Sequence, residues 1–256
     1  MFLIAGPCLI ESYGIIDEVA SELSKYKSKT GLEIYLKGSY RKANRTSVSS
    51  FEGIGDEKAL EILKSVGEKY SLPTITDVHL PSEVAMAAEY VNAIQIPAFL
   101  ARQTELLVKA GETGLPINIK KGQFMSPYDV VKAAKKVEST GNKKVWLCER
   151  GTFFGYNDLV VDFRSMAIMR NEGYNVVYDA THSLQRPSIG EQSGGYGELI
   201  PNLARAAVAS GIDGLFMEIH PDPQNAKSDK ETQLPLDKFV PLMDTLLAIE
   251  KAAQSN

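Results

Sequence analysis

The sequence lacks the features that indicate nucleic-acid binding, membrane insertion or a disulfide-rich fold. Its formal net charge is only −4 over 256 residues, which gives no general electrostatic reason to bind nucleic acid. The opening residues MFLIAGPC contain no basic segment followed by a long apolar run, so neither a signal peptide nor a membrane span is expected. The two cysteines, Cys8 and Cys148, could pair, but without a secretion signal we expect reduced thiols and a cytoplasmic protein.

The sequence also lacks long linkers, low-complexity segments and a glycine-rich dinucleotide fingerprint. Strand-like and helix-like segments alternate regularly along the whole chain. Short β-branched or aromatic runs alternate eight times with longer segments of helical composition, such as 57–70, 82–90, 128–140 and 199–210. Eight such units predict a single (β/α)8 barrel over residues 1–256, with an open doubly wound sheet as the alternative. How the bottom of the barrel is sealed stays open. The predicted strands are 2–5, 33–36, 74–77, 93–96, 117–120, 144–149, 175–179 and 214–218.

Polar residues stand at the ends of nearly all of these predicted strands. Barrel enzymes carry their chemistry at the C-terminal ends of the strands and in the loops that follow. Surface polarity alone would not place ionisable groups so regularly. The strand-end residues include Lys37, Asp77, Gln95, Lys120, Arg150, Asp179, His182 and Glu218.

The densest cluster of cations lies in KGSYRKANRTS, residues 37–47. It is either a solvated basic loop or part of an anion site, because massed Lys and Arg side chains repel one another unless anions neutralise them. Barrel order favours the anion site, since it brings cations from strands two, five and six around one pocket. That pocket suits a substrate with phosphate and carboxylate groups. The cations are Lys37, Lys42, Arg45, Lys120 and Arg150.

A second group has the composition of a metal site. Cys8, His182 and Glu218 follow strands one, seven and eight, which become neighbours when a barrel closes, and Asp229 can fold back from the next loop. Sulfur, nitrogen and oxygen ligands together tolerate zinc, iron(II) or manganese. Taken singly, each residue also has a simpler interpretation: a packed thiol, a hydrogen-bonded histidine or a turn-capping aspartate.

Several motifs resemble one enzyme family. The motifs GPCLIES, KANRTS, IQIPAFLARQTEL, NIKKGQF, ERGTFFGYNDLVVDFRS, YDATHSLQ, SGG, DGLFMEIHPDP and SDKETQLPL occur in this order, and the match runs from residue 1 to about residue 236. Together they are similar to the 3-deoxy-D-manno-octulosonate 8-phosphate synthases, which condense phosphoenolpyruvate with D-arabinose 5-phosphate in the synthesis of a lipopolysaccharide precursor. The KANR segment separates them from the sister family that makes 3-deoxy-D-arabino-heptulosonate 7-phosphate, which carries a Lys-Pro-Arg motif there.

The resemblance implies a role for each candidate residue. It places a divalent metal on Cys8, His182, Glu218 and Asp229, whereas metal-independent relatives have Asn at the position of Cys8. It makes Arg102 a contact to the sugar phosphate of a neighbouring subunit, and therefore implies an oligomer, a homotetramer. The residues implied to hold or act on phosphoenolpyruvate are Lys37, Ser39, Lys42, Gln95, Lys120 and Arg150. Those implied to hold the sugar are Asn44, Arg45 and Thr46, and we add Asp77 and Gln185 as substrate-binding residues and His182 as a catalytic one.

Two other functions stay open, namely the sister heptulosonate synthase and a non-catalytic barrel that binds sugar phosphates. A barrel that had lost catalysis would be expected to lack a lysine or a ligand, and all are present. One segment departs from the family pattern: Arg41 stands where an acid is common. The salt bridges around it are therefore not predicted.

Overall fold

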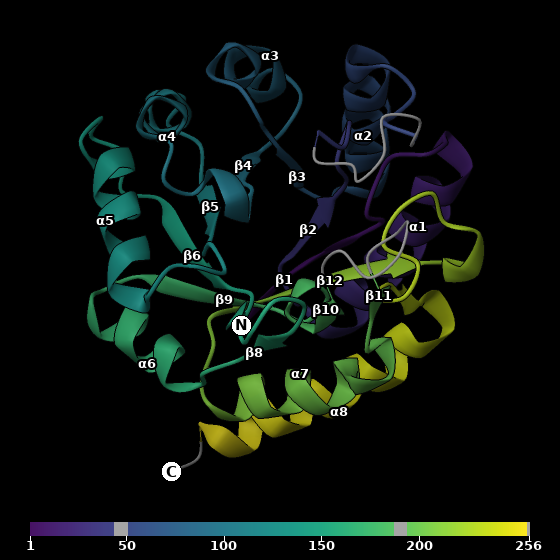
Figure 1. Ribbon diagram of the computed structural model, residues 1–256. Helices are drawn as coiled ribbons and strands as arrows, with labels where there is room; N and C mark the ends of the chain where they lie inside the picture. The colour runs from purple at the N-terminus through teal and green to yellow at the C-terminus, as the bar shows by residue number, and fades with distance from the viewer. Residues whose placement is uncertain (44–50, 187–193, 255–256) are drawn as a thin grey trace.

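The chain folds into a closed barrel of eight parallel strands (Figure 1). The computed structural model describes residues 1–43, 51–186 and 194–254. The first strand pairs in parallel with the last, from Phe2 opposite Gly214 to Gly6 opposite Glu218. This pairing closes the barrel, so the predicted (β/α)8 fold is confirmed and the open sheet is excluded. The barrel strands are β1 Phe2–Gly6, β2 Ile34–Lys37, β3 Thr74–Asp77, β4 Ala93–Ile96, β5 Ile117–Lys120, β6 Val145–Glu149, β9 Asn175–Asp179 and β12 Gly214–His220.

Helices surround the barrel, and local signals set their ends. The Ser126 side chain accepts a hydrogen bond from the backbone N–H of Asp129, and Pro127 occupies the first turn, as expected for the start of α5. The predicted helix 82–90 is shorter, because a 3₁₀ turn at Pro81–Glu83 precedes α3. In the described residues the helices are α1 Tyr13–Thr30, α2 Asp56–Tyr70, α3 Val84–Ala88, α4 Thr104–Glu112, α5 Pro127–Glu138, α6 Arg164–Asn171, α7 Ile200–Ala209 and α8 Leu236–Ala253.

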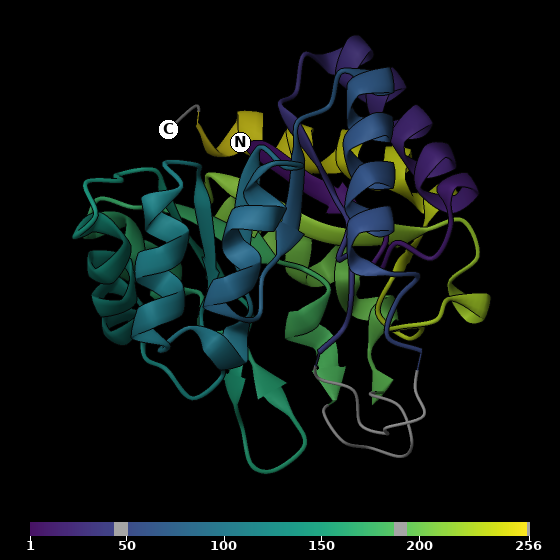
Figure 2. The same ribbon diagram turned by 90° about the horizontal axis from the view of Figure 1, so that it is seen from above.

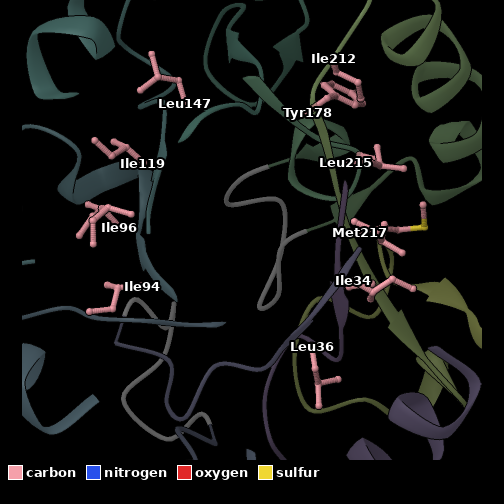
Figure 3. Close-up of a cluster of buried hydrophobic side chains, with 14 of the residues drawn as sticks. Ile34, Leu36, Ile94, Ile96, Ile119, Leu147, Tyr178, Ile212, Leu215 and Met217 are labelled. Atoms are coloured by element: carbon pink, nitrogen blue, oxygen red, sulfur yellow. The ribbon is translucent and has the colours of Figure 1, made fainter. Parts of the chain in front are cut away.

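The larger hydrophobic core lies between the strands and the helices. Side chains alternate along a strand, so every second residue of each barrel strand points outward to the helices. Figure 3 shows a cluster of these buried side chains, among them Leu36 on β2, Ile94 on β4 and Met217 on β12. The helices contribute their apolar faces to the same core, and this burial supplies most of the hydrophobic stabilisation of the fold.

The interior of the barrel is a separate, smaller core. It contains Ile4, Ile75, Ala93, Trp146, Cys148, Val177 and Phe216, with Phe2 and Tyr35 packed against it. At the N-terminal end three rings meet: the centroids of Phe2 and Trp146 are 4.8 Å apart, and those of Tyr35 and Trp146 are 5.2 Å apart in an edge-to-face arrangement. These rings seal the bottom of the barrel, which the sequence left open.

Additional short strands lie at the C-terminal end of the barrel. Hairpin β7 Thr152–Phe153 with β8 Leu159–Val160 follows β6, and β10 Gln185–Arg186 with β11 Gly194–Gly195 follows β9. Figure 2 shows both antiparallel strand pairs at the same end of the barrel. A further strand, β13 Leu234–Pro235, pairs with the end of β12 and follows the loop that carries Asp229. In the described part of the chain, no helix has both the length and the apolar character that a membrane span requires.

Candidate active site

The C-terminal end of the barrel interior is polar and buried. Seven buried residues lie at or near the C-terminal ends of the barrel strands: Lys37, Asp77, Gln95, Lys120, Arg150, Asp179 and Glu218. Lys120 ends β5, and each of the other six follows a residue of the inner core or of the aromatic seal by two positions. The two-residue period of a strand therefore turns them into the barrel. The Phe216 ring forms the floor beneath them, because Lys120 Nζ lies 3.8 Å and Lys37 Nζ 5.7 Å from its centroid. The predicted strand-end residues thus converge on one site.

The protein's own acids neutralise most of the cations in this layer. Lys37 Nζ lies 2.7 Å from Glu218 Oε1, and Lys120 Nζ lies 2.8 Å from Asp179 Oδ2. Lys42 Nζ donates to Ser39 Oγ at 3.1 Å, and Ser39 Oγ donates to Asp77 Oδ2 at 2.7 Å. The expectation that substrate anions balance the cations therefore needs refinement, because internal carboxylates already do much of this.

The acids remain ionised because of these cations. Burial alone raises the pKa of Asp77, but the positive charges of Lys37 and Lys42 outweigh burial and hold that pKa well below its usual range. Burial likewise opposes ionisation of Glu218, yet Lys37 and His182 lower its pKa to about 2. Gln95 completes the layer by donating to Asp77 Oδ1 at 2.5 Å.

Arg150 is a cation of this layer with unused donors. Its Nη2 donates to Gln185 Oε1 at 3.1 Å, while the buried Nε and Nη1 have no hydrogen-bond partner among the described residues. Burial lowers the pKa of the guanidinium, with only partial compensation from Asp179. A buried guanidinium with two unpartnered nitrogen donors is a site for an anion.

Three of the four predicted metal ligands lie together. The ligand atoms of Cys8, Glu218 and Asp229 are within 4.8 Å of one another, and Cys8 Sγ lies 3.0 Å from Asp229 Oδ2. His182 is outside that mutual group, but its Nε2 is 3.6 Å from Glu218 Oε1 and 3.8 Å from Asp229 Oδ2. Within the described chain, Glu218 Oε2 is buried without a partner. Burial, reinforced by Asp229 and Glu218, raises the pKa of the Cys8 thiol, so a thiolate here needs a cation; the residues fit a divalent metal.

Residues that the sequence analysis did not assign to the site hold these ligands in place. Asp179 Oδ2 lies 2.8 Å from His182 Nδ1, which leaves Nε2 to face the ligand cluster, as second-shell carboxylates do for metal-bound histidines. Gln233 accepts from the backbone N–H of Cys8 at 3.1 Å. Asp229 itself has a left-handed backbone with φ 49°, a conformation that non-glycine residues adopt at some energetic cost. The position of Asp179 at a strand end, three residues before His182, was the available signal.

The other predicted residues have different outcomes. Asn44, Arg45 and Thr46 lie outside the described residues. Arg102 is exposed on the loop between β4 and α4, and its backbone carbonyl accepts from Lys136 Nζ at 2.9 Å. Cys8 and Cys148 are both free and buried, so the expectation of unpaired thiols is confirmed.

A hollow of about 520 Å³ lies at the other end of the molecule, beside the starts of β3 and β4. Its lining includes Lys64, Pro73, Tyr90 and Asn92. None of the buried, unpartnered polar atoms found in the described residues belongs to that lining. The buried polar residues described above lie instead at the C-terminal ends of the strands.

Known proteins resemble this chain over nearly its whole length. The profile of the DAHP synthetase I family matches residues 1–255. A protein of Syntrophotalea carbinolica named 2-dehydro-3-deoxyphosphooctonate aldolase is 48% identical over 99% of this chain and 92% of its own length. Proteins of the same name from Xylella fastidiosa and Hydrogenovibrio crunogenus are 49% and 45% identical, over 98% and 99% of this chain and 91% and 92% of their own lengths.

Proposed function

The chain belongs to the DAHP synthetase I family, and from this membership and its site we propose that it is a 3-deoxy-D-manno-octulosonate 8-phosphate synthase. It condenses phosphoenolpyruvate with D-arabinose 5-phosphate and water, and releases inorganic phosphate. One observation carries the proposal: cations suited to phosphate and carboxylate groups and a cluster of sulfur, nitrogen and oxygen ligands share one end of the barrel. The names of the close relatives support the same activity.

We assign phosphoenolpyruvate to the cationic half of the polar layer. The unpartnered Nε and Nη1 of Arg150 offer charge-assisted hydrogen-bond donors to its phosphate or carboxylate. Lys120, at the end of β5, and Lys42, in the loop after β2, add charge, and Gln95 on β4 lines the same layer. Fixed cations hold the anionic substrate in an attack geometry without reorganising during the reaction, which accounts for much of the expected rate enhancement.

The reaction forms one carbon–carbon bond and breaks one carbon–oxygen bond. C3 of phosphoenolpyruvate bonds to the aldehyde carbon of the open-chain sugar, whose oxygen gains a proton. Water adds at C2 and loses a proton. Collapse of that adduct forms the C2 carbonyl and breaks the bond between C2 and the phosphate oxygen, and the hydroxyl proton passes to the departing phosphate. Positive charge that develops at C2 faces the ionised carboxylates of the layer, such as Glu218, while Lys120, paired with Asp179, balances the departing phosphate.

We further propose that Cys8, His182, Glu218 and Asp229 hold a divalent ion of zinc, iron(II) or manganese. When bound, it would polarise the sugar aldehyde or orient a hydroxyl or the attacking water. Asp179 fixes the ring of His182, and Gln233 fixes the backbone of Cys8. Both contacts hold the ligands before any ion binds.

Phosphate release from phosphoenolpyruvate tests this function when it is measured with each aldose phosphate, with and without chelator. Arabinose 5-phosphate should support release far better than erythrose 4-phosphate, and chelation should abolish it in step with loss of bound metal by elemental analysis. Cys8→Asn should retain activity that no longer responds to metal. Equal turnover with both sugars would overturn the assignment, and full activity of metal-free protein would overturn the metal site.

An oligomer, which we propose to be a cytoplasmic homotetramer, would complete the site. Arg102 is exposed, and Phe99, Phe124 and Phe154 are exposed aromatic side chains in loops at the same end of the barrel. Such a group of apolar rings is typical of a surface that another subunit covers.

The proposed role of Arg102 is to bind the sugar phosphate in a neighbouring subunit. Arg102→Ala should weaken the apparent affinity for arabinose 5-phosphate roughly ten- to hundred-fold, because it removes one charge-assisted contact. Affinity for phosphoenolpyruvate should hardly change. Mixing Arg102→Ala with Lys120→Ala chains should restore part of the activity. No recovery despite proven subunit exchange would assign Arg102 to another role.

A further inference from the structure

A buried carboxylate, Glu83, joins the two loops that follow β2 and β3. Its Oε2 accepts from the Tyr40 hydroxyl at 2.5 Å and from the backbone N–H of His79 at 2.8 Å. Its Oε1 binds the guanidinium of Arg41. Tyr40 is fully buried, and its ring stands edge-on to that of His79 with centroids 5.8 Å apart. Glu83 therefore fixes two consecutive residues of the β2 loop from the neighbouring loop.

Arg41, the residue that departs from the family pattern, has two acidic partners here. Besides Glu83, its Nη1 lies 3.3 Å from Asp56 Oδ2, and Asp56 is the first residue of α2. One guanidinium thus connects the β2 loop, the β3 loop and the start of a helix. A planar fork with five donors is suited to such a bridge, whereas an ammonium is not.

The clamp formed by Tyr40, Arg41 and Glu83 lies directly beside Lys42. The backbone N–H of Lys42 donates to the carbonyl of Glu52 at 2.9 Å. Its Nζ donates to Ser39 Oγ, which in turn donates to Asp77. Burial opposes the charge of Lys42, but the ionised carboxylates of Glu218 and Asp77 raise its pKa. The lysine is therefore charged and aimed into the site, and the clamp holds the backbone from which it extends.

We propose that Glu83 and Arg41 are positioning residues for phosphoenolpyruvate, acting through Lys42. This inference rests on the proposed function. Neither residue touches the substrate. Without the clamp the backbone at residue 41 is free to move, so Lys42 spends part of its time away from the anion. Binding of phosphoenolpyruvate then weakens, while a saturated enzyme retains its turnover.

Calorimetric titration of phosphoenolpyruvate into the metal-loaded enzyme without sugar, together with kcat and KM, tests the proposal. Arg41→Met should weaken binding by about five- to thirty-fold, the scale of one lost charged contact, with kcat within about threefold. Arg41→Lys should recover part of the affinity. Tyr40→Phe, which removes only a hydroxyl, should give a smaller effect in the same direction and is the variant most certain to fold.

Two controls separate positioning from general destabilisation. Arg170→Met removes an arginine whose Nε lies 3.5 Å from Asp213 Oδ2 beyond the N-terminal end of the barrel, and should leave phosphoenolpyruvate affinity unchanged. In a Lys42→Met background, Arg41→Met should have no further effect on affinity, because its partner in the mechanism is gone.

The outcomes also separate this inference from the proposed function. If the parent enzyme does not bind phosphoenolpyruvate, the function fails. If the parent binds and the Arg41 and Tyr40 variants bind equally well, even with lower melting temperatures, the clamp is only structural and the positioning role is wrong. Full additivity of Arg41→Met with Lys42→Met would contradict the route through Lys42.

Discussion

The two ends of the barrel interior are built on the same strands and have opposite chemistry. At the N-terminal end, Phe2, Tyr35 and Trp146 pack ring against ring. At the C-terminal end, Lys37 follows Tyr35 by two residues on β2, and Arg150 follows Trp146 by four residues, directly after the end of β6. Because alternate residues of a strand face the barrel interior, a few positions along one strand separate the aromatic end from the polar end.

The difference lies in how each end affects stability. Aromatic packing at the bottom is favourable without a ligand, because it removes apolar surface from water. The polar top contains features that cost free energy in the unliganded protein, such as the unpartnered N–H groups of Arg150 and the left-handed backbone of Asp229. We therefore expect the bottom to control stability and the top to control activity.

The largest expected difference between an effect on activity and an effect on stability is at Arg150. Arg150→Met should lower kcat/KM on the order of 10²-fold or more, because it removes two charge-assisted contacts to the substrate. Its melting temperature should stay the same or rise, since the side chain makes only one hydrogen bond among the described residues, to Gln185. Phosphate-release kinetics and thermal unfolding of the same preparation measure both effects.

Arg164→Met is a matched control for this change. Arg164 is an exposed arginine whose Nε lies 2.9 Å from Asp162 Oδ1, so its loss should alter neither activity nor stability by much. A large fall in the melting temperature of Arg150→Met would show that the top of the barrel also carries the fold, and would break the proposed division.

The reciprocal change is at the bottom, and its effect should fall on stability. Trp146→Ala should lower the free energy of unfolding by about 3–5 kcal/mol, because it leaves a cavity where two other rings meet. Activity per folded molecule should change by less than about threefold. Denaturant unfolding and active-site titration check this, and Trp146→Phe serves as the milder variant. A loss of activity that exceeds the loss of folded protein would mean that the seal also positions the site.

The sequence predicted the barrel well, because strand and helix signals are local. The third, fourth, fifth and seventh predicted strands match β3, β4, β5 and β9 residue for residue, and β12 runs two residues past its prediction to His220. The ring of polar strand ends was predictable for the same reason, since the period of a strand and the closure of the barrel fix which residues meet.

Partners that depend on side chains far apart in the sequence could not be read from it. Arg41 meets Glu83, and Asp179 meets Lys120, only because the fold brings separate strands and loops together. The seal of Phe2, Tyr35 and Trp146 combines three strands in the same way. A single sequence shows which residues are polar or aromatic, but not which of several acids pairs with a given cation.

Phe216 lies between the apolar and the polar end of the barrel interior. Of the substitutions considered, we expect Phe216→Leu to have the smallest effect. Its ring belongs to the inner apolar core and also lies 3.8 Å from Lys120 Nζ. Phe216→Leu should cost about 1–2 kcal/mol of stability. Loss of the cation–π contact, on the order of 0.5–2 kcal/mol at a desolvated site, should also weaken phosphoenolpyruvate binding by roughly two- to thirty-fold.

Phe239→Leu isolates the stability part of this effect. Phe239 is equally buried, but it lies in the outer core, where its ring centroid is 5.3 Å from that of Tyr26. It should lose similar stability and keep its affinity for phosphoenolpyruvate, measured by calorimetry beside Phe216→Leu. If both variants keep that affinity, Phe216 belongs to the stabilising lower part of the barrel alone. Substrate binding would then depend on the charged residues above Phe216 and not on its ring. A change in packing at Phe216 can affect binding only through its contact with Lys120.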